Sequence, residues 1–403
     1  MTAMRLPSDQ DASGRSFGQD EMDALAEVLA SGTLTATKGD FTKRFEAAVS
    51  EMIGVEHVIS CSSGSAAVHV AVAGVDPEPG DEIVTTSITD MGALTPILYQ
   101  GAIPVFADVD PVSMNVTAET IAAVLSPRTK AIIVTHLFGN PCQMDEIMAL
   151  AAERGIPVIE DAAQAYMALS RGRAVGTLGA VGCFSAQQGK HITAGEGGFV
   201  TTKDAALARR MRMFVNKAWP YGEANPDHEF IAPNYRTTEL QSAVLLAQLP
   251  KLAGHVRTRI DNAARLSKQL EGVRGLGVPE HDAGDVHVFW RYALRVDPAV
   301  IPGGPVGLAN QLKFYDIAAA PRYVNKPAFR CKVFADQVTF GNSHWPFTLA
   351  RPEAVDYRAE KFPGTFAGLD HVLVFPWNEK MTAEHMDFLA ASIVEAVGSL
   401  VRP

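Results

Sequence analysis

The sequence predicts an α/β fold, in which helices flank a mainly parallel central sheet and a smaller α+β domain follows. Two observations predict this class. Between about residue 45 and residue 252, short apolar segments rich in β-branched residues alternate with amphipathic segments, a pattern typical of βαβ units. The chain also has 403 residues, of which 47% are hydrophobic, and this is enough for two domains with a large core.

Six short segments are predicted to be strands of the central sheet. They are apolar throughout, as expected for strands that helices cover on both faces. The amphipathic segments between them are predicted to be helices, and a further helix is expected near the N-terminus. The strands span residues 82–86, 104–108, 131–135, 157–160, 182–185 and 198–202, and the helices span residues 19–31, 117–125, 143–154 and 204–215.

The domain boundary is placed in a long helical region. Residues 237–252 predict a helix, and the pattern continues after Pro250 into a polar helix near residues 255–272. We therefore predict a large α/β domain with its N-terminal helix over residues 1–252, and a smaller α+β domain over residues 253–403. The smaller domain is expected to contain strands near residues 289–296 and 371–375 and a closing helix over residues 382–401.

Charge and composition exclude several classes of protein. The formal net charge of −10 argues against a nucleic-acid partner, because phosphate binding needs a basic surface. The four cysteines form no C-x-x-C pair, which is typical of reduced thiols in a cytosolic protein. No apolar run approaches the ~18 residues of a membrane span, and the polar N-terminal residues lack the apolar core of a leader. The expected location is the cytoplasm, without a membrane partner.

Metal and serine-nucleophile chemistry is also not predicted. The eleven histidines form no H-x-x-x-H or H-E-x-x-H pair, and no G-x-S-x-G segment occurs. These spacings carry zinc sites and hydrolase nucleophiles, so we expect neither.

Three residues at predicted strand ends point to one cofactor. Lys190 lies in a glycine-bearing segment after the strand at residues 182–185, Ser185 ends that strand, and Asp161 follows the strand at residues 157–160. Ligands of such sheets bind beyond the carboxyl ends of the strands. A lysine amine, a carboxylate for a pyridine nitrogen and a hydroxyl for a phosphate are what pyridoxal 5'-phosphate (PLP) needs from a protein.

Each of these residues also has a plainer interpretation. Asp161 fits a helix N-cap and Lys190 fits a solvated surface lysine. The segment at residues 60–67 follows an apolar strand and opens a helix with small hydroxyl residues. It fits an anion cradle, but it also fits a simple turn with a cap. The prediction depends on all these segments occurring together and in this order.

In these segments the chain resembles the sugar aminotransferases of the DegT-like family, which belong to PLP fold type I within the aspartate aminotransferase superfamily. The similarity runs from about Phe17 to the C-terminus and is densest before residue 252. It is carried by residues 62–67 (SSGSAA), 101–108 (GAIPVFAD), 160–165 (EDAAQA), 185–198 (SAQQGKHITAGEGG) and 234–241 (NYRTTELQ).

The resemblance implies a role for each matching residue. Lys190 would form the Schiff base with PLP and move the proton on the substrate carbon, and Asp161 would hold the pyridine nitrogen protonated. Gln164 would lie near the phenolic oxygen of the ring. The phosphate would be held by Gly64, Ser65 and Ser185, and by Asn234 from the neighbouring subunit, which implies a homodimer with shared active sites.

The sequence departs from the family pattern at one position. The family usually has a threonine followed by an aromatic residue that stacks on PLP. Here Thr89 matches, but Asp90 stands at the aromatic position. Met91 is an alternative cover for the ring. A carboxylate cannot stack in this way, so the residue that covers the cofactor is left open.

The resulting interpretation is a PLP-dependent aminotransferase that transfers an amino group from glutamate or glutamine to a keto-sugar or keto-cyclitol, in amino-sugar, aminocyclitol or natural-product biosynthesis. One alternative is a dehydratase of the same fold, in which a histidine replaces the lysine. Here Lys190 occupies that position and His191 follows it. The other alternative is a non-catalytic PLP-binding regulator, but no basic helix-turn-helix segment is present.

The acceptor is expected to be a six-membered ring ketone and not an α-keto acid. Asp90 would accept hydrogen bonds from ring hydroxyls and would repel an acid. Residues 322–329 resemble a branch of the family that is often linked to inositol-type ketones. A nucleotide-linked sugar would instead need cations for its pyrophosphate, for which the candidates are Lys38, Arg322, Lys326 and Arg330.

Overall fold

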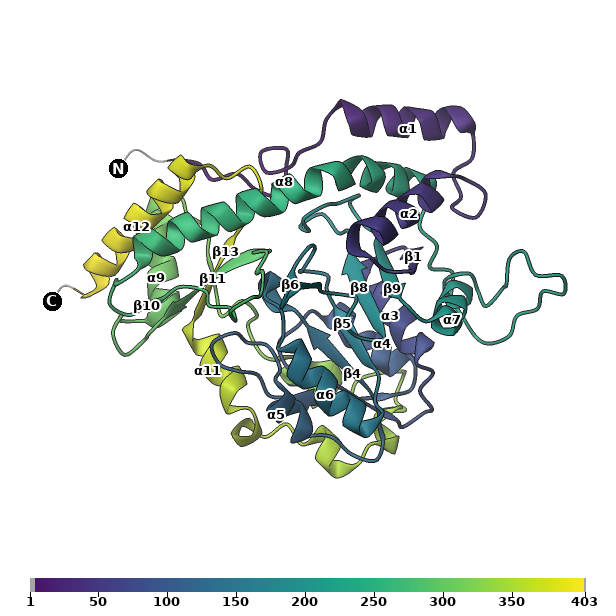
Figure 1. Cartoon of the computed structure of the whole chain (residues 1–403). Helices are drawn as coiled ribbons and strands as arrows, with labels where there is room; N and C mark the ends of the chain where they lie inside the picture. Colours follow the sequence, from purple (N-terminus) through teal and green to yellow (C-terminus); the bar gives the residue numbers. More distant parts are fainter. Residues whose placement is uncertain (1–3, 402–403) are drawn as a thin grey trace.

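The computed structural model describes residues 4–401, and a seven-stranded sheet lies at its centre (Figure 1). The strand order is β1-β9-β8-β5-β4-β2-β3. Strand β9 is antiparallel to both of its neighbours, and the other neighbouring strands are parallel. The predicted α/β class with a mostly parallel sheet is therefore confirmed. The strands are β1 (His57–Cys61), β2 (Glu82–Thr86), β3 (Ile103–Ala107), β4 (Thr129–Thr135), β5 (Val158–Asp161), β8 (Val181–Ser185) and β9 (Gly198–Thr202).

The six predicted strands lie within two residues of their expected bounds because burial on both faces makes them apolar throughout. Strands β2, β3, β5, β8 and β9 are buried at every position. Successive side chains point to opposite faces, so Ile133 packs into one apolar core and Val134 into another. Each face of the sheet is thus a helix-packing surface.

Helices cover the two faces of the sheet. The first face packs against α3 (Gly64–Gly74) and α7 (Ala205–Val215). The second packs against α2 (Phe41–Ile53), α6 (Met144–Arg154) and the N-terminal half of the longest helix, α8 (Glu239–Leu270). Other elements around this sheet are α1 (Gln19–Ser31), α4 (Thr95–Tyr99), α5 (Ala118–Ala122), and the short strands β6 (Leu169–Ser170) and β7 (Arg173–Ala174).

One continuous helix joins the two parts of the molecule. The helix expected over residues 237–252 and its continuation over residues 255–272 form a single helix, α8 (Glu239–Leu270), which runs through Pro250 (Figure 1). Proline lacks the amide hydrogen and crowds the preceding turn, and packing on both sides of Pro250 compensates for this loss. Leu249 belongs to the core under the large sheet and Leu266 to the core of the small sheet. The division at residue 252 falls inside this helix and stays a prediction.

A four-stranded antiparallel sheet forms the C-terminal part, in the order β10-β11-β13-β12. Its apolar core is shared with α9, α12 and the C-terminal half of α8. No helix within residues 4–401 is long and apolar enough to cross a membrane. The elements are β10 (Leu276–Gly277), β11 (Arg291–Val296), β12 (Ala320–Pro321), β13 (Val372–Pro376), α9 (Gly304–Leu312), α10 (Lys332–Ala335), α11 (Pro363–His371) and α12 (Ala383–Val401).

Candidate functional site

A cavity of about 400 Å³ lies where the carboxyl ends of the parallel strands meet. Six of the seven residues that the sequence indicated line it together, although they are up to 126 positions apart in the chain. Asn234 is the seventh and does not line it. The six residues are Gly64, Ser65, Asp161, Gln164, Ser185 and Lys190.

Asp161 is the last residue of β5 and is buried. Its Oδ1 accepts a hydrogen bond from the amide of Ala163 at 3.1 Å. The element that follows β5 is the short strand β6, so Asp161 is not the N-cap of a helix. Burial raises the pKa of Asp161, while the Ala163 amide and the Lys190 amine oppose the rise. Because a protonated ring nitrogen would stabilise the charged carboxylate, the position suits a pyridinium partner.

Lys190 follows β8, in a turn where its amide donates to the carbonyl of Gln187 at 2.9 Å. Its Nζ lies 4.2 Å from the ring centroid of Trp290. Burial lowers the pKa of Lys190 to about 8, although Asp161 acts in the opposite direction. A lowered pKa increases the fraction of neutral amine, which is the nucleophilic form.

The start of α3 and the end of β8 form a cradle of the kind that binds phosphate. The Ser63 hydroxyl caps the helix by accepting from the Ala66 amide at 3.0 Å, and the amides of the first turn point out of the helix end. A Cβ added at Gly64 would lie 2.6 Å from Cβ and 2.8 Å from Oγ of Ser185. Only glycine therefore lets the helix start approach Ser185 so closely.

Gln164 and Tyr323 form another wall of the cavity. The Oε1 of Gln164 accepts from the Phe138 amide at 2.7 Å, which leaves the NH₂ group of Gln164 free to act as a donor. Burial raises the pKa of Tyr323 to about 12, with the Gln164 side chain opposing the rise. The phenol is therefore a hydrogen-bond donor at neutral pH.

The loop with the unusual Asp90 also reaches the cavity. Asp90 and Thr89 line it, whereas Met91 does not and instead packs in an apolar cluster with Leu94 and Phe329. Asp90 is exposed and accepts from the Gly92 amide at 2.7 Å. Met91 is therefore not placed to cover a ring in this cavity.

Two aromatic residues of the cavity were missed at the sequence level. Trp290 lies just before β11, and its Nε1 donates to the carbonyl of Gly189 at 2.7 Å. Tyr323 has a φ of +56°, and Arg322 before it has a φ of +67°. No sequence motif predicts that Trp290 or Tyr323 lines the cavity. Tyr323 does lie in residues 322–329, the segment that resembles one branch of the family.

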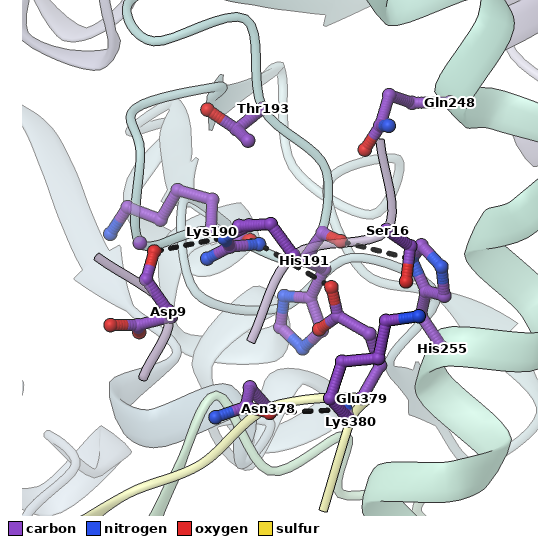
Figure 2. Close-up of polar contacts among 12 residues, drawn as sticks. Asp9, Ser16, Lys190, His191, Thr193, Gln248, His255, Asn378, Glu379 and Lys380 are labelled. Atoms are coloured by element: carbon purple, nitrogen blue, oxygen red, sulfur yellow. Dashed lines mark hydrogen bonds and ion pairs between the residues drawn. The ribbon is translucent and has the colours of Figure 1, made fainter. Parts of the chain in front are cut away.

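His191 does not line the cavity, although it follows Lys190 directly in the sequence. Its ring is fully buried and points away from the Lys190 side chain (Figure 2). The Nε2 of His191 lies 3.2 Å from the carbonyl oxygen of Val288, and burial holds the pKa of the ring well below its usual value. A neutral, enclosed imidazole cannot replace the lysine at the cavity.

The remaining candidates lie outside the cavity. Asn234 is exposed and forms an isolated bridge with Asn216, so its predicted contact with a partner's phosphate stays a prediction. Lys38, Lys326 and Arg330 are exposed, and Arg322 forms an ion pair with Asp370. None of these four cations lines the cavity.

The N-terminal segment is tied to the back of the site by buried charges (Figure 2). Arg15 donates to the carbonyl of Lys190 at 2.8 Å and to that of Asp9 at 2.9 Å. Glu379 lies between Arg15, at 3.6 Å, and Arg259, at 2.9 Å. This cluster connects the N-terminal segment, α8 and the end of the small sheet directly beneath Lys190.

Within residues 4–401, no three histidine, cysteine, aspartate or glutamate side chains gather in a way that would hold an ion.

Comparisons with known proteins all point to one family of aminotransferases. The model of the DegT/DnrJ/EryC1/StrS aminotransferase family matches residues 15–355. The GDP-perosamine synthase of Caulobacter vibrioides is 33% identical over 318 residues, which cover 76% of this chain and 84% of that protein. The UDP-N-acetyl-3-dehydro-alpha-D-glucosamine 3-aminotransferase of Acidithiobacillus ferrooxidans is 38% identical over 261 residues, covering 64% of this chain and 69% of that protein.

A solved structure shows the same fold. The aminotransferase from Psychrobacter cryohalolentis superposes with a TM-score of 0.86 and 28% identity, covering 96% of this chain and 99% of that one. The expected fold type I architecture is therefore confirmed over nearly the whole chain.

Proposed function

The chain belongs to the DegT/DnrJ/EryC1/StrS aminotransferase family and is a PLP-dependent aminotransferase, and from this premise we propose that it transfers an amino group from glutamate or glutamine to a keto-sugar or keto-cyclitol. The observation that carries the proposal is one cavity that holds a partly neutral lysine, a buried carboxylate and an anion cradle. These are the groups that PLP requires, so the residues present fit the cofactor.

Each side chain has a separate task in this proposal. When bound, PLP supplies a carbonyl that accepts the amino group and a ring that withdraws electrons from the reacting carbon. Lys190 anchors the cofactor and carries the proton to and from the substrate carbon. Asp161 keeps a proton on the ring nitrogen, and Gln164 donates to the ring oxygen. The amides of Gly64 and Ser65 and the hydroxyl of Ser185 bind the phosphate.

The charge of the cavity favours a neutral acceptor over an α-keto acid. Three carboxylates line it, those of Asp90, Asp161 and Glu196, against the single amine of Lys190. After Asp161 pairs with the ring nitrogen, Asp90 and Glu196 remain near the opening, and both are exposed. They repel an acidic acceptor and accept hydrogen bonds from hydroxyl groups of a polyol.

Half-reactions test the acceptor directly. The protein is loaded with pyridoxamine phosphate and mixed with inososes, nucleotide-linked and free keto-sugars, pyruvate or oxaloacetate, and the return of the PLP absorbance is timed. We expect a ring ketone to react fastest. A faster reaction of pyruvate or oxaloacetate than of every ring ketone contradicts the proposed acceptor class.

The site residues are tested in the same assay. Lys190→Ala is expected to abolish amino transfer, because it removes both the anchor and the proton carrier. In the unchanged protein, borohydride reduction followed by peptide mass analysis should find the pyridoxyl group on Lys190. A pyridoxyl group on another lysine contradicts the assignment.

The dehydratase alternative is less well supported. That activity needs a histidine where this chain has Lys190, and the adjacent His191 is enclosed and faces away from the cavity. A Lys190→His variant that gained dehydration of a keto-deoxy sugar would show how close the two activities are, whereas dehydration by the unchanged protein would favour the alternative.

A further inference from the structure

A second pocket lies at the edge of the large sheet, where residues of α2, of the end strand β1 and of α7 line it (Figure 1). Its volume is about 280 Å³, a size that suits a small molecule. It shares no lining residue with the cavity at Lys190. The proposed amino transfer therefore gives this pocket no task.

The pocket has positive side chains that no carboxylate balances. Four cations and two carboxylates line it. Both carboxylates, those of Glu46 and Glu223, are already paired with arginines of α7, at 3.0 Å and 2.9 Å. The other two cations, Lys43 and Arg236, form no ion pair within residues 4–401. An anion is the ligand that these two side chains favour.

Three enclosed polar atoms of the lining have no hydrogen-bond partner in the described part of the chain. They are the Oγ of Ser60, the Oδ1 of Asn216 and the Nη1 of Arg236. Ser60 is only 5% exposed. Because buried polar groups of folded proteins nearly always have partners, three such atoms around one pocket indicate a ligand that supplies them.

The unpartnered atoms need two kinds of partner. The guanidinium of Arg236 can only donate a hydrogen bond, and the Oδ1 of Asn216 can only accept one. The direction of this amide is set because its Nδ2 donates to the carbonyl of Arg212 at 2.8 Å. The ligand therefore carries both an acceptor and a donor. A hydroxyl group is a donor that adds no positive charge beside Lys43 and Arg236.

Charge and surface narrow the ligand further. A phosphate monoester carries about two negative charges at neutral pH, which matches the two cations that have no ion pair. Trp219 and Tyr221 add aromatic surface to the lining, and such surface packs against an apolar ring face. A phosphorylated ring polyol combines these parts, because it has an oxyanion for the cations and hydroxyl groups for Ser60 and Asn216.

We propose that this pocket is a binding site for a phosphorylated ring polyol, such as a sugar phosphate, and that it is separate from the site of amino transfer. Lys43 and Arg236 bind the phosphate, and Ser60 and Asn216 bind hydroxyl groups. The other candidate occupant is a second copy of the chain. The Arg236 amide donates to the Oδ1 of Asn234 at 3.3 Å, and Asn234 is predicted to contact a neighbouring subunit.

Calorimetric titration of the PLP-loaded protein tests the site, because PLP then fills the phosphate cradle near Lys190. The ligands are glucose 6-phosphate, glucose 1-phosphate and myo-inositol 1-phosphate, with glucose and inorganic phosphate titrated separately. We expect at least one of the three esters to bind once per subunit, and at least about tenfold more tightly than glucose or inorganic phosphate. No binding of any ester, the result expected if a second copy fills the pocket, overturns the proposal. Equally tight binding of inorganic phosphate also overturns it.

Two variants assign the binding to this pocket. Lys43→Gln should raise the dissociation constant of the bound ester about tenfold, the usual loss for a charged hydrogen bond. The control is Lys203→Gln, which removes the same charge from an exposed lysine outside the pocket and should leave the affinity unchanged. Unchanged affinity in Lys43→Gln, or an equal loss in Lys203→Gln, overturns the proposal.

Ser60→Ala separates ligand binding from folding. The Ser60 hydroxyl has no partner within the described residues, so its removal should not lower the melting temperature. The dissociation constant of the ester should nevertheless rise about threefold or more. A lower melting temperature with unchanged affinity would show a purely structural role for Ser60 and overturn its assignment to the ligand. These titrations need no amino transfer, so their outcome is independent of which acceptor the protein uses.

Discussion

At the scale of single residues, burial gives Lys190 the property on which its chemistry depends. Its pKa falls from the ordinary value of 10.5 to about 8 because the ammonium form loses solvation on burial, while the charge of Asp161 partly opposes the fall. The amine therefore becomes neutral above about pH 8, well before a solvated lysine does. The rate at which the PLP-free protein takes up PLP should rise with pH and level off above this value.

Asp161→Asn tests both effects of the carboxylate. Without its charge the pKa of Lys190 should fall, so the midpoint of the PLP-uptake profile should move to lower pH. The turnover of the loaded variant should fall by about 10²–10⁴-fold, the usual size of a proton-transfer contribution. Stopped-flow absorbance gives the first quantity and steady-state assays the second. An unchanged midpoint with unchanged turnover would show that Asp161 acts only as the acceptor of the Ala163 amide in the turn after β5.

At the scale of elements, the contact between α3 and β8 decides whether the anion cradle exists. Gly64→Ala would place a methyl group 2.6 Å from Cβ of Ser185, and overpacking of this kind typically costs about 1–3 kcal/mol. The helix start has to move away from Ser185, so PLP affinity measured by fluorescence titration should fall about tenfold or more.

A glycine elsewhere in the molecule serves as the matched control. Gly398 lies in α12, and a Cβ added there meets no atom within 4 Å outside the backbone of its own helical turn. Gly398→Ala should leave PLP affinity unchanged and stabilise the protein slightly, since alanine is the better helix former. Unchanged PLP affinity in Gly64→Ala would show that the close approach of the helix start to Ser185 does not contribute to phosphate binding.

At the scale of the whole molecule, the buried cluster of Arg15, Glu379 and Arg259 connects segments from both ends of the chain. Glu379 and Arg259 are almost fully enclosed, with side chains 2% and 0% exposed. Glu379→Gln removes the only carboxylate that the structure places between the two arginines in residues 4–401. Breaking a buried pair of this kind typically costs about 3–5 kcal/mol.

Urea unfolding followed by circular dichroism measures this loss. The control is Glu153→Gln on the exposed side of α6, which should change the unfolding midpoint little. Equal unfolding midpoints for the two variants would mean that the buried cluster of Arg15, Glu379 and Arg259 does not stabilise the folded protein.

The role that the family resemblance implies for Asn234, binding the phosphate of the neighbouring subunit, predicts a homodimer with shared active sites. Lys190→Ala and Asn234→Ala should each be inactive alone. Mixed dimers of the two variants contain one site with neither change, so mixing them after partial unfolding and refolding should restore part of the activity. An active monomer by light scattering, or no recovery on mixing, contradicts the shared site. The interface is expected to bury about 2,000 Å² or more.

The amino-acid sequence by itself determined the α/β class, the strand positions and the residues at the strand ends. Asp161, Ser185 and Lys190 could be found from short stretches of sequence. Asp161 and Ser185 each end an apolar strand, and Lys190 lies in the turn that follows the second of these strands. Gly64 and Ser65 are visible for the same reason, as the start of a helix after a strand. Parallel pairing then brings these ends to one edge of the sheet.

Only the tertiary structure decided which residues surround Asp161, Ser185 and Lys190. Trp290 and Tyr323 come from the C-terminal part of the chain, and Arg15, which donates to the carbonyl of Lys190, comes from the N-terminal segment. Their positions depend on how the small sheet, α8 and the segment around Arg15 pack together, and no local spacing records that packing. The continuity of α8 through Pro250 has the same origin, because apolar contacts on both sides of the proline outweigh its local preference for a break.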